Sequence, residues 1–341
     1  QTEIVHGVHI ISELLEIIIK ENTMGLKVAE IEGDAVLFYK YTEQPTLKEL
    51  YEQCKEMFLA FHQHIKLYER DRICECGSCS GTPNLTLKFI VHYGDVIERN
   101  ILGHFQLMGA DVTTAHKLMK NNLDTDEYIL ISESSILKND TSHVPSWFKL
   151  QNGSMHYDDV GEVNYKYEKF TELRNEIPEL PPRKKIMDEP VQFTITYFMP
   201  HSLEATFKLL SSLERKHEWI EGVKKINFDE TKIERIGTTH ECVTPLNKLH
   251  IETTRIEKRG DTNIFGEEAD AVGIFPAANQ LYSLTKKREN ECEIRLEVRF
   301  KTNLLNTLIF KNLFKSGLTK SLTKLERVLT QDKSNSQHLI G

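Results

Sequence analysis

Three cysteines lie within six residues, at Cys74, Cys76 and Cys79 in the stretch CECGSC. Thiolates at this spacing suit zinc, which takes four nitrogen or sulfur ligands in tetrahedral geometry. A fourth ligand is not evident from the sequence. His62 and His64 lie upstream and would reach the cysteines only if the intervening helix ended before Cys74. The alternative is a cluster of reduced thiols with a structural or redox-active role.

An acidic hairpin is the second candidate, in the stretch EIEGDAVLFYK at residues 30–40. Gly33 permits a tight turn between two strand-like apolar runs, and Asp34 projects its carboxylate from that turn. Divalent cations such as Mg²⁺ are bound by carboxylate oxygens, so Asp34 is a candidate metal ligand. Most Gly-Asp turns are only turns, but two segments follow this one in a suggestive order. They are a strand ending at a glycine, LTLKFIVHYGD at 85–95, and a glycine turn opening a helix, GADVTTAHKL at 109–118.

This ordered set resembles the catalytic domain of class III nucleotidyl cyclases over residues 1–140. The resemblance is closest to a bacterial cyclase-like family that carries a Cys-rich insert and a START-like domain behind it. The family shows a Gly-Asp-Ala hairpin, a strand ending near His-Tyr-Gly or a similar turn, and a helix starting as G-x-x-V-N-x-A-x-R-[LM]. In such cyclases two carboxylates hold two magnesium or manganese ions, which promote in-line phosphoryl transfer within a purine nucleotide.

The resemblance implies roles for five residues. Asp34 matches the second metal-binding aspartate, and Glu30 and Gln106 match the two positions that read the purine base. Thr113 stands where the family has an asparagine that orients the ribose. Lys117 stands where the family has the arginine that contacts the transition state. Lysine keeps the charge but lacks the planar two-pronged donor of arginine, so it is a poor substitute there.

The strand that carries the family's first metal-binding aspartate, of the form D-I-x-G-F-T, has no counterpart in this sequence. The chain begins at Gln1 and is helical by about His9, so we expect a fragment or a truncated chain without that first strand. Asp34 alone cannot hold two metal ions. We therefore expect a degenerate cyclase-like domain in a sensory or regulatory binding protein. The alternative is an active purine-nucleotide cyclase, a phosphorus–oxygen lyase, whose metal site is completed by residues upstream of Gln1.

Periodicity indicates which elements would position these residues. Residues 8–20 and 46–70 have apolar positions spaced by threes and fours, as in amphipathic helices. Another helix is expected at 112–121. Strands are expected at 85–92 and 128–132, with an edge strand at 164–170. With one strand added at the front, the order is βαββαβ, the ferredoxin-like core of cyclase domains. We assign residues 1–170 to this domain.

A linker and a second domain follow. Residues 173–190 contain four prolines and many charges, so we expect an extended linker at 171–190. The second domain, at 191–330, begins with a strand at 192–198 and a helix at 203–213. Five strand-like segments come next, at 223–229, 237–243, 249–258, 279–288 and 291–302.

A long helix closes this domain at 304–329, ahead of a tail at 331–341 that we expect to be disordered. This element order, with HEWIEGVKKI at 217–226, resembles the START-like or polyketide-cyclase helix-grip superfamily. That fold forms an apolar cavity between its sheet and its helix, so the resemblance implies a hydrophobic small molecule as ligand. Side chains that could instead fill the cavity are Phe193, Trp219, Phe265, Phe275, Tyr282 and Phe300.

The bulk properties fit an α+β protein of two domains. The chain has 341 residues, of which 28% are charged and 39% hydrophobic, values ordinary for a globular protein. The formal charge of −8 gives no nucleic-acid footprint, so no nucleic-acid partner is expected. No apolar run is long enough to cross a membrane, and no membrane partner is expected. The six cysteines do not form a secreted disulfide pattern, which favours the cytoplasm. The cyclase resemblance implies a homodimer through the first domain.

Overall fold

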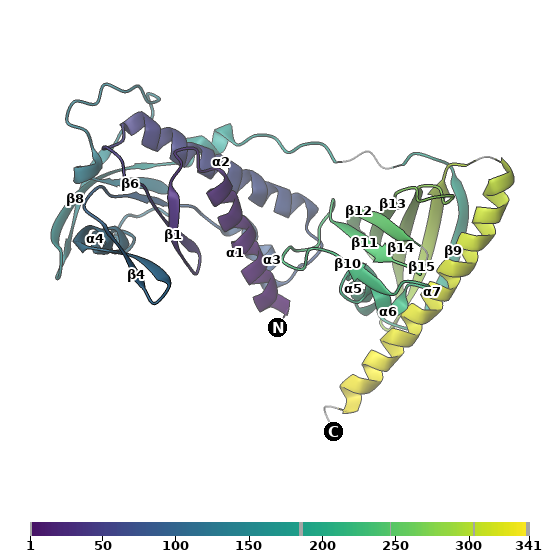
Figure 1. The fold of residues 1–341 in the computed structure, drawn as a ribbon. Coiled ribbons are helices and arrows are strands. Elements are labelled where there is room, and N and C mark those ends of the chain that lie inside the picture. The colour runs from purple at the N-terminus through teal and green to yellow at the C-terminus, as the bar shows by residue number, and fades with distance from the viewer. Residues whose placement is uncertain (1, 184–186, 246, 303, 339–341) are drawn as a thin grey trace. The chain divides into compact units, whose positions relative to one another are not determined.

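The computed structural model describes residues 2–183, 187–245, 247–302 and 304–338. The protein is a mixed α+β chain of helices and largely antiparallel sheets, as the sequence predicts. It divides into two compact units (Figure 1). The first comprises Gln1–Arg70 and Cys76–Leu180, and the second comprises Asp71–Glu75 and Pro181–Gly341.

The first unit contains four α-helices among its described residues: α1 (Thr2–Lys20), α2 (Leu47–Asp71), α3 (Gly77–Gly81) and α4 (Ala110–Leu118). Its strands are β1 (Lys27–Glu32), β2 (Ala35–Tyr39), β3 (Phe89–Val91), β4 (Ile97–Ile101), β5 (His104–Met108), β6 (Tyr128–Ser132), β7 (Gln151–Tyr157) and β8 (Gly161–Lys169). Four of them form a sheet in the order β3-β6-β8-β7, in which β3 and β6 are parallel.

The central strand of this sheet, β6, is buried along its whole length. Ile129 and Ile131 join the core cluster under α2, while Tyr128 and Leu130 join the one that contains Leu118 of α4. Successive side chains of a strand point to opposite faces. The alternation along β6 therefore places α2 and α4 on the two faces of the sheet.

Several predictions for the first unit were wrong. The hairpin β1–β2 was expected within one ferredoxin-like sheet, but it forms a separate two-stranded sheet, as does the unpredicted hairpin β4–β5. The strand predicted at the edge, β8, lies between β6 and the unpredicted β7. The polar sequence of β7 hid it, because this strand lies at the sheet edge and buries only alternate residues in part. The predicted linker begins too early: Leu173 is fully buried in the core with α2, and the first unit extends to Leu180.

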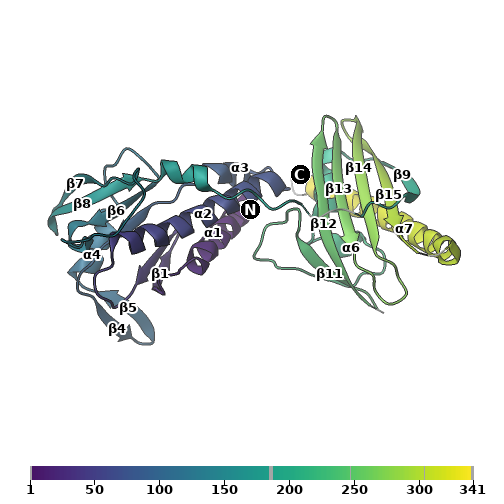
Figure 2. The same cartoon turned by 90° about the horizontal axis from the view of Figure 1, so that it is seen from above.

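The second unit has three helices among its described residues: α5 (Leu203–Ser211), α6 (Lys216–Trp219) and α7 (Leu304–His338). Its strands are β9 (Val191–Met199), β10 (Lys225–Asn227), β11 (Thr239–Val243), β12 (Lys248–Arg259), β13 (Thr262–Ala269), β14 (Ala278–Arg288) and β15 (Glu291–Phe300). They form one antiparallel sheet in the order β10-β11-β12-β13-β14-β15-β9, and α7 runs across one face of it (Figure 2). The strand missed by the sequence analysis, β13, carries a buried glutamate that obscured its apolar character.

The closing helix differs from its prediction in two ways. It begins at Leu304 as expected but continues to His338, so residues 331–338 of the predicted disordered tail are helical, while 339–341 lie outside the described residues. The apolar spacing along this helix predicts Leu308 and Ile309 on the inward face, but they are 64% and 63% exposed. Among the side chains described on this helix, those buried in the apolar core include Phe310, Leu322, Leu325 and Leu329.

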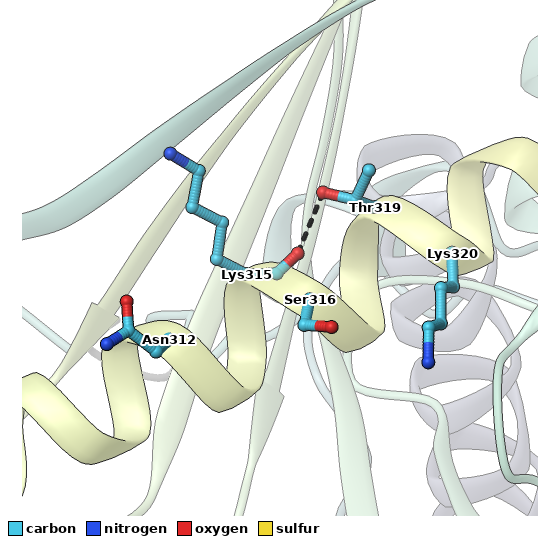
Figure 3. Close-up of a pocket in the computed structure, with 5 residues that line it drawn as sticks. All are labelled: Asn312, Lys315, Ser316, Thr319 and Lys320. Carbon is cyan, nitrogen blue, oxygen red and sulfur yellow. Dashed lines mark hydrogen bonds between the residues drawn. The ribbon is translucent and has the colours of Figure 1, made fainter.

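The aromatic side chains expected around the predicted pocket belong to the core of the second unit. Five of the six expected fillers are buried in the core, and Phe275 packs against it in part. The recess described on α7 is open to solvent, with a volume of about 400 Å³ (Figure 3). It is lined by Asn312, Lys315, Ser316, Thr319 and Lys320. Its two lysine side chains extend in different directions in Figure 3, so they do not converge on one point.

Candidate functional site

Four potential metal ligands lie close together near the start of α1 and the segment that follows α2. His6, Cys74, Cys76 and Cys79 each offer one ligand atom, and these atoms all lie within 4.8 Å of one another. His6 Nδ1 lies 3.4 Å from Cys79 Sγ and 3.6 Å from Cys76 Sγ. The predicted convergence of the three cysteines is confirmed, and His6 adds a fourth potential ligand atom.

These separations match a tetrahedral zinc site. Bonds of ~2.3 Å to sulfur and ~2.0–2.1 Å to nitrogen at tetrahedral angles place a sulfur and a nitrogen ligand about 3.5 Å apart. Cys79 is buried and the other three ligands are partly exposed. A site with four protein ligands leaves no open coordination position, which is typical of structural zinc rather than catalytic zinc.

The helix α1 and the cysteine segment approach closely at Gly7. A Cβ on Gly7 would lie 3.2 Å from Ser78 Oγ, whereas one on Gly77 would meet only the flexible carboxylate of Glu3. Ser78 Oγ also donates a hydrogen bond to the carbonyl of Glu3 at 2.8 Å. The first turns of α1 therefore lie directly on α3, which brings His6 to the cysteines. Cys74 is held nearby by chain connectivity, two residues before Cys76.

Sequence reasoning missed His6 and considered the wrong histidines. His64 Nε2 lies 3.0 Å from Glu13 Oε2, and His62 Nε2 lies 2.9 Å from Glu127 Oε1. Both histidines therefore have carboxylate partners within the first unit. His6 is far from the cysteines in sequence, so only the packing of α1 on α3 reveals it.

The residues assigned by the cyclase resemblance are distributed over several exposed elements. Asp34 lies at the exposed turn of the β1–β2 hairpin, as predicted, and belongs to no group of three or more metal ligands among the described residues. Glu30 on β1 and Gln106 on β5 are also exposed. Their hairpins meet through the rings of Tyr39 and Phe105, whose centroids are 5.8 Å apart.

The two positions expected at the reacting phosphate lie on α4. Thr113 is exposed, and its hydroxyl donates to the carbonyl of Gly109 at 3.3 Å. Lys117 Nζ lies 3.1 Å from Asp159 Oδ1, so its charge has a partner.

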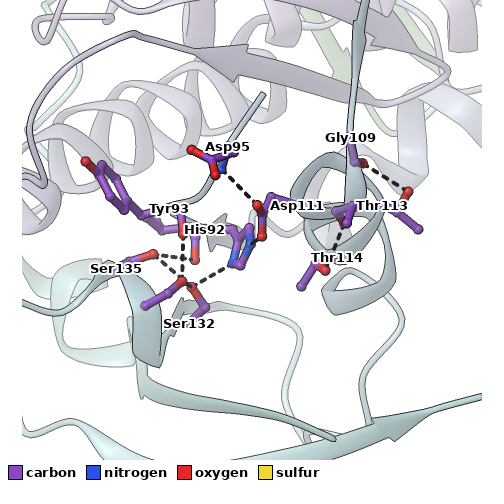
Figure 4. Close-up of polar contacts among 12 residues, drawn as sticks. His92, Tyr93, Asp95, Gly109, Asp111, Thr113, Thr114, Ser132 and Ser135 are labelled. Atoms are coloured by element: carbon purple, nitrogen blue, oxygen red, sulfur yellow. Dashed lines mark hydrogen bonds and ion pairs between the residues drawn. The ribbon is translucent and has the colours of Figure 1, made fainter. Parts of the chain in front are cut away.

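A serine, a histidine and an aspartate form a hydrogen-bonded chain at the end of β3 (Figure 4). His92 Nδ1 lies 2.8 Å from Ser132 Oγ, and His92 Nε2 lies 2.9 Å from Asp111 Oδ1. Asp111 also accepts from the backbone N–H of Asp95 at 2.8 Å. Ser132 is only 1% exposed and also contacts the hydroxyl of Ser135, so it is not placed to attack a substrate. The chain joins the end of β3 to α4 and β6.

Glu127 has two strong partners in the first unit. Its Oε1 lies 2.9 Å from His62 Nε2 and accepts from Arg174 Nη2 at 2.6 Å, and its Oε2 accepts from Arg174 Nε at 2.7 Å. Burial raises the pKa of Glu127, but the close approach of His62 and the hydrogen bonds from Arg174 outweigh it and lower the pKa to about 2. The folded state therefore favours the ionised carboxylate.

This shift predicts an acid-dependent loss of stability. An unfolded glutamate has a pKa near ~4.3, so the contribution of Glu127 is fully present above that value and is lost as the pH falls toward ~2. We expect Glu127→Gln to lower the free energy of unfolding of the first unit by about 2 kcal/mol at neutral pH, and by progressively less in acid. Urea unfolding followed by Trp147 fluorescence, in a Trp219→Phe background, measures it. Glu162→Gln, at an exposed position of β8, is the control. A loss of unfolding free energy in Glu127→Gln that does not change with pH would contradict the lowered pKa of Glu127.

Comparison with known proteins identifies relatives of part of the chain. Residues 11–128 match a family described as a protein of unknown function, DUF2652. An uncharacterized protein of Mycobacterium tuberculosis is 30% identical over 122 residues, which are 36% of this chain and 57% of that protein. The chain thus spans little more than half the length of the curated relative it matches.

Solved structures are similar to about two fifths of the chain. A conserved protein of Geobacillus kaustophilus is 10% identical and has a TM-score of 0.34, covering 40% of this chain and 94% of its own. A norcoclaurine synthase of Thalictrum flavum, determined with a transition-state analogue, is 8% identical and has a TM-score of 0.35, covering 41% of this chain and 94% of its own. Among the described residues, no helix has the length and apolar character needed to cross a membrane.

Proposed function

We propose that this chain is a binding protein in which a degenerate nucleotidyl cyclase-like unit is joined to a START-like unit for a hydrophobic small molecule. The observation that carries the proposal is the second unit's seven-stranded antiparallel sheet with the long helix α7 packed along it. Such an arrangement supports a helix-grip assignment, and its core is lined by apolar and aromatic side chains. The proposed role is sensory or regulatory, with ligand binding to the second unit changing the behaviour of the first unit.

The first unit is proposed to be non-catalytic because its chemical positions are incomplete. A two-metal mechanism needs carboxylates that share both ions. Asp34 is exposed at a turn, and Lys117 is paired with Asp159. Glu30 and Gln106 lie on exposed hairpins, where they are accessible to a ligand. A purine nucleotide is therefore a candidate ligand that the first unit binds but does not convert.

We expect the purified chain to form no cyclic nucleotide from ATP or GTP with magnesium or manganese. Loss of one metal carboxylate and replacement of arginine by lysine should each remove a few kcal/mol of transition-state stabilisation. Chromatography of the reaction mixture against a protein-free blank measures this. Turnover that is lost in Asp34→Ala but kept in Asp124→Ala, at an exposed loop position, would instead support the alternative of an active purine-nucleotide cyclase.

We also propose that His6, Cys74, Cys76 and Cys79 bind one Zn²⁺ ion as a structural centre. The support is the N···S separations of 3.4 and 3.6 Å and the complete set of four N and S ligands. The metal would tie α1 to the segment that follows α2, a role for which a closed coordination sphere is suited. The homodimer and the cytoplasmic location remain predictions.

A further inference from the structure

The core of the second unit contains three polar side chains that contribute little to a hydrophobic core. Lys216 on α6, Glu267 on β13 and His240 on β11 are 1%, 5% and 3% exposed. They come from three elements that are distant in sequence and meet on the inner side of the sheet. Charged residues are almost never so deeply buried unless they are paired.

The lysine and the glutamate are paired, and the histidine lies beside them. Lys216 Nζ donates a hydrogen bond to Glu267 Oε1 and lies 5.9 Å from the ring centroid of Phe265. His240 Nε2 lies 3.8 Å from the same glutamate oxygen, beyond hydrogen-bond distance. Neither ring nitrogen of His240 has a hydrogen-bond partner among the described residues.

His240 is a neutral imidazole with two unused polar atoms. Burial, followed by the charge of Lys216, lowers its pKa to about 2. A neutral imidazole has one N–H donor and one acceptor nitrogen. A buried polar group without a partner costs about 1–3 kcal/mol, so this histidine is not explained by stability.

The ion pair is not explained by stability either. Transfer of two charges from water to the interior often costs more free energy than their mutual attraction contributes. A protein with apolar residues of similar volume in place of the ion pair is often as stable or more stable. A buried polar group that lowers the stability of the ligand-free protein is suited to bind a polar group of a ligand. The surroundings are apolar, with Phe265 and Tyr282 at 1% and 2% exposure.

The charges of this cluster indicate what kind of group it would accept. Glu267 compensates Lys216, so the pair has no net charge. A further carboxyl, Glu234, interacts electrostatically with both, and burial raises its pKa to about 7. An anionic ligand would meet two carboxyl groups for one lysine, so a neutral group with hydrogen-bonding capacity fits best.

We propose that Lys216, Glu267 and His240 form the polar end of the ligand site in the second unit, and bind a hydroxyl or carbonyl group of an otherwise apolar small molecule. The inference rests on the proposed binding function of this unit and adds the chemical class of the ligand. His240 supplies the donor or acceptor, and the Lys216–Glu267 pair fixes the polarity of the site.

A matched pair of fluorescent probes tests the proposal on the full chain. Prodan is a dimethylaminonaphthalene with a ketone, and the second probe is the same dimethylaminonaphthalene without it. We expect His240→Phe to weaken Prodan binding about tenfold, since loss of one hydrogen bond costs about 1.4 kcal/mol. The probe without the ketone should change by less than about twofold. The control is His250→Phe, on neighbouring β12, whose side chain is 65% exposed.

The outcomes separate this inference from the function on which it rests. If both probes bind and His240→Phe leaves Prodan affinity unchanged, the polar end is wrong but the hydrophobic site stands. If neither probe binds the wild-type protein, both proposals fail. Should His240→Phe not fold, the wild-type complex is still informative, because Prodan emission moves to longer wavelength when its carbonyl accepts a hydrogen bond. Bound Prodan that emits as it does in hydrocarbon solvent would overturn the inference.

Discussion

Removal of the proposed zinc ion is expected to lower the melting temperature of the first unit by about 10 °C, and His6→Ala or Cys79→Ala should do the same. Structural zinc contributes folding free energy directly, because the ligand set is assembled only in the folded chain. Loss of about 3–5 kcal/mol produces a shift of this size in a unit of this length. Cys79 should be the most sensitive cysteine, since it is fully buried.

Two measurements check the zinc prediction. Atomic emission should find one zinc per chain in the wild-type protein and a marked loss in His6→Ala. Calorimetry with and without a chelator should show the shift in the melting temperature. His9→Ala is the matched control, a substitution of the same residue type on the same helix α1 at a partly exposed position. A metal-free protein whose melting is unaffected by chelation would identify the cysteines as a reduced thiol cluster.

Lys216→Met is expected to destabilise the second unit by about 3–5 kcal/mol, because it leaves the charge of Glu267 buried without a partner. The double variant Lys216→Met/Glu267→Leu should return to within about 1 kcal/mol of the wild type, since both charges are then removed. Lys216 and Glu267 are 1% and 5% exposed, so solvent cannot screen the orphaned charge.

Urea unfolding followed by Trp219 fluorescence, in a Trp147→Phe background, measures these effects. Trp219 is 1% exposed and belongs to the same core cluster of the second unit. Lys248→Met is the control, because Lys248 pairs with Glu241 at 3.0 Å while 64% exposed. Breaking an exposed pair costs about 1 kcal/mol or less. A double variant as unstable as the single one would mean that the pair stabilises the fold, and would weaken the case for a ligand site.

Local patterns in the sequence determined much of this protein. The turn at Gly33 and Asp34, the amphipathic helix α2 and most strands of the second unit were predicted from residue spacing alone. The convergence of Cys74, Cys76 and Cys79 also followed from sequence, because short spacing limits how far apart the thiols can lie. In each case the sequence pattern that supports the prediction spans only a few helical turns or a few residues of a strand.

Tertiary structure decided the features that depend on distant contacts. His6 joins the three cysteines only because α1 packs on α3, with Gly7 allowing the close approach to Ser78. The strand β13 was hidden because Glu267 looks like a surface residue until Lys216 is placed beside it. A charge or a histidine has the same appearance in sequence whether solvent or a buried partner surrounds it. Burial and partnership arise only when separate elements pack, so the sites that depend on them were not visible in the chain alone.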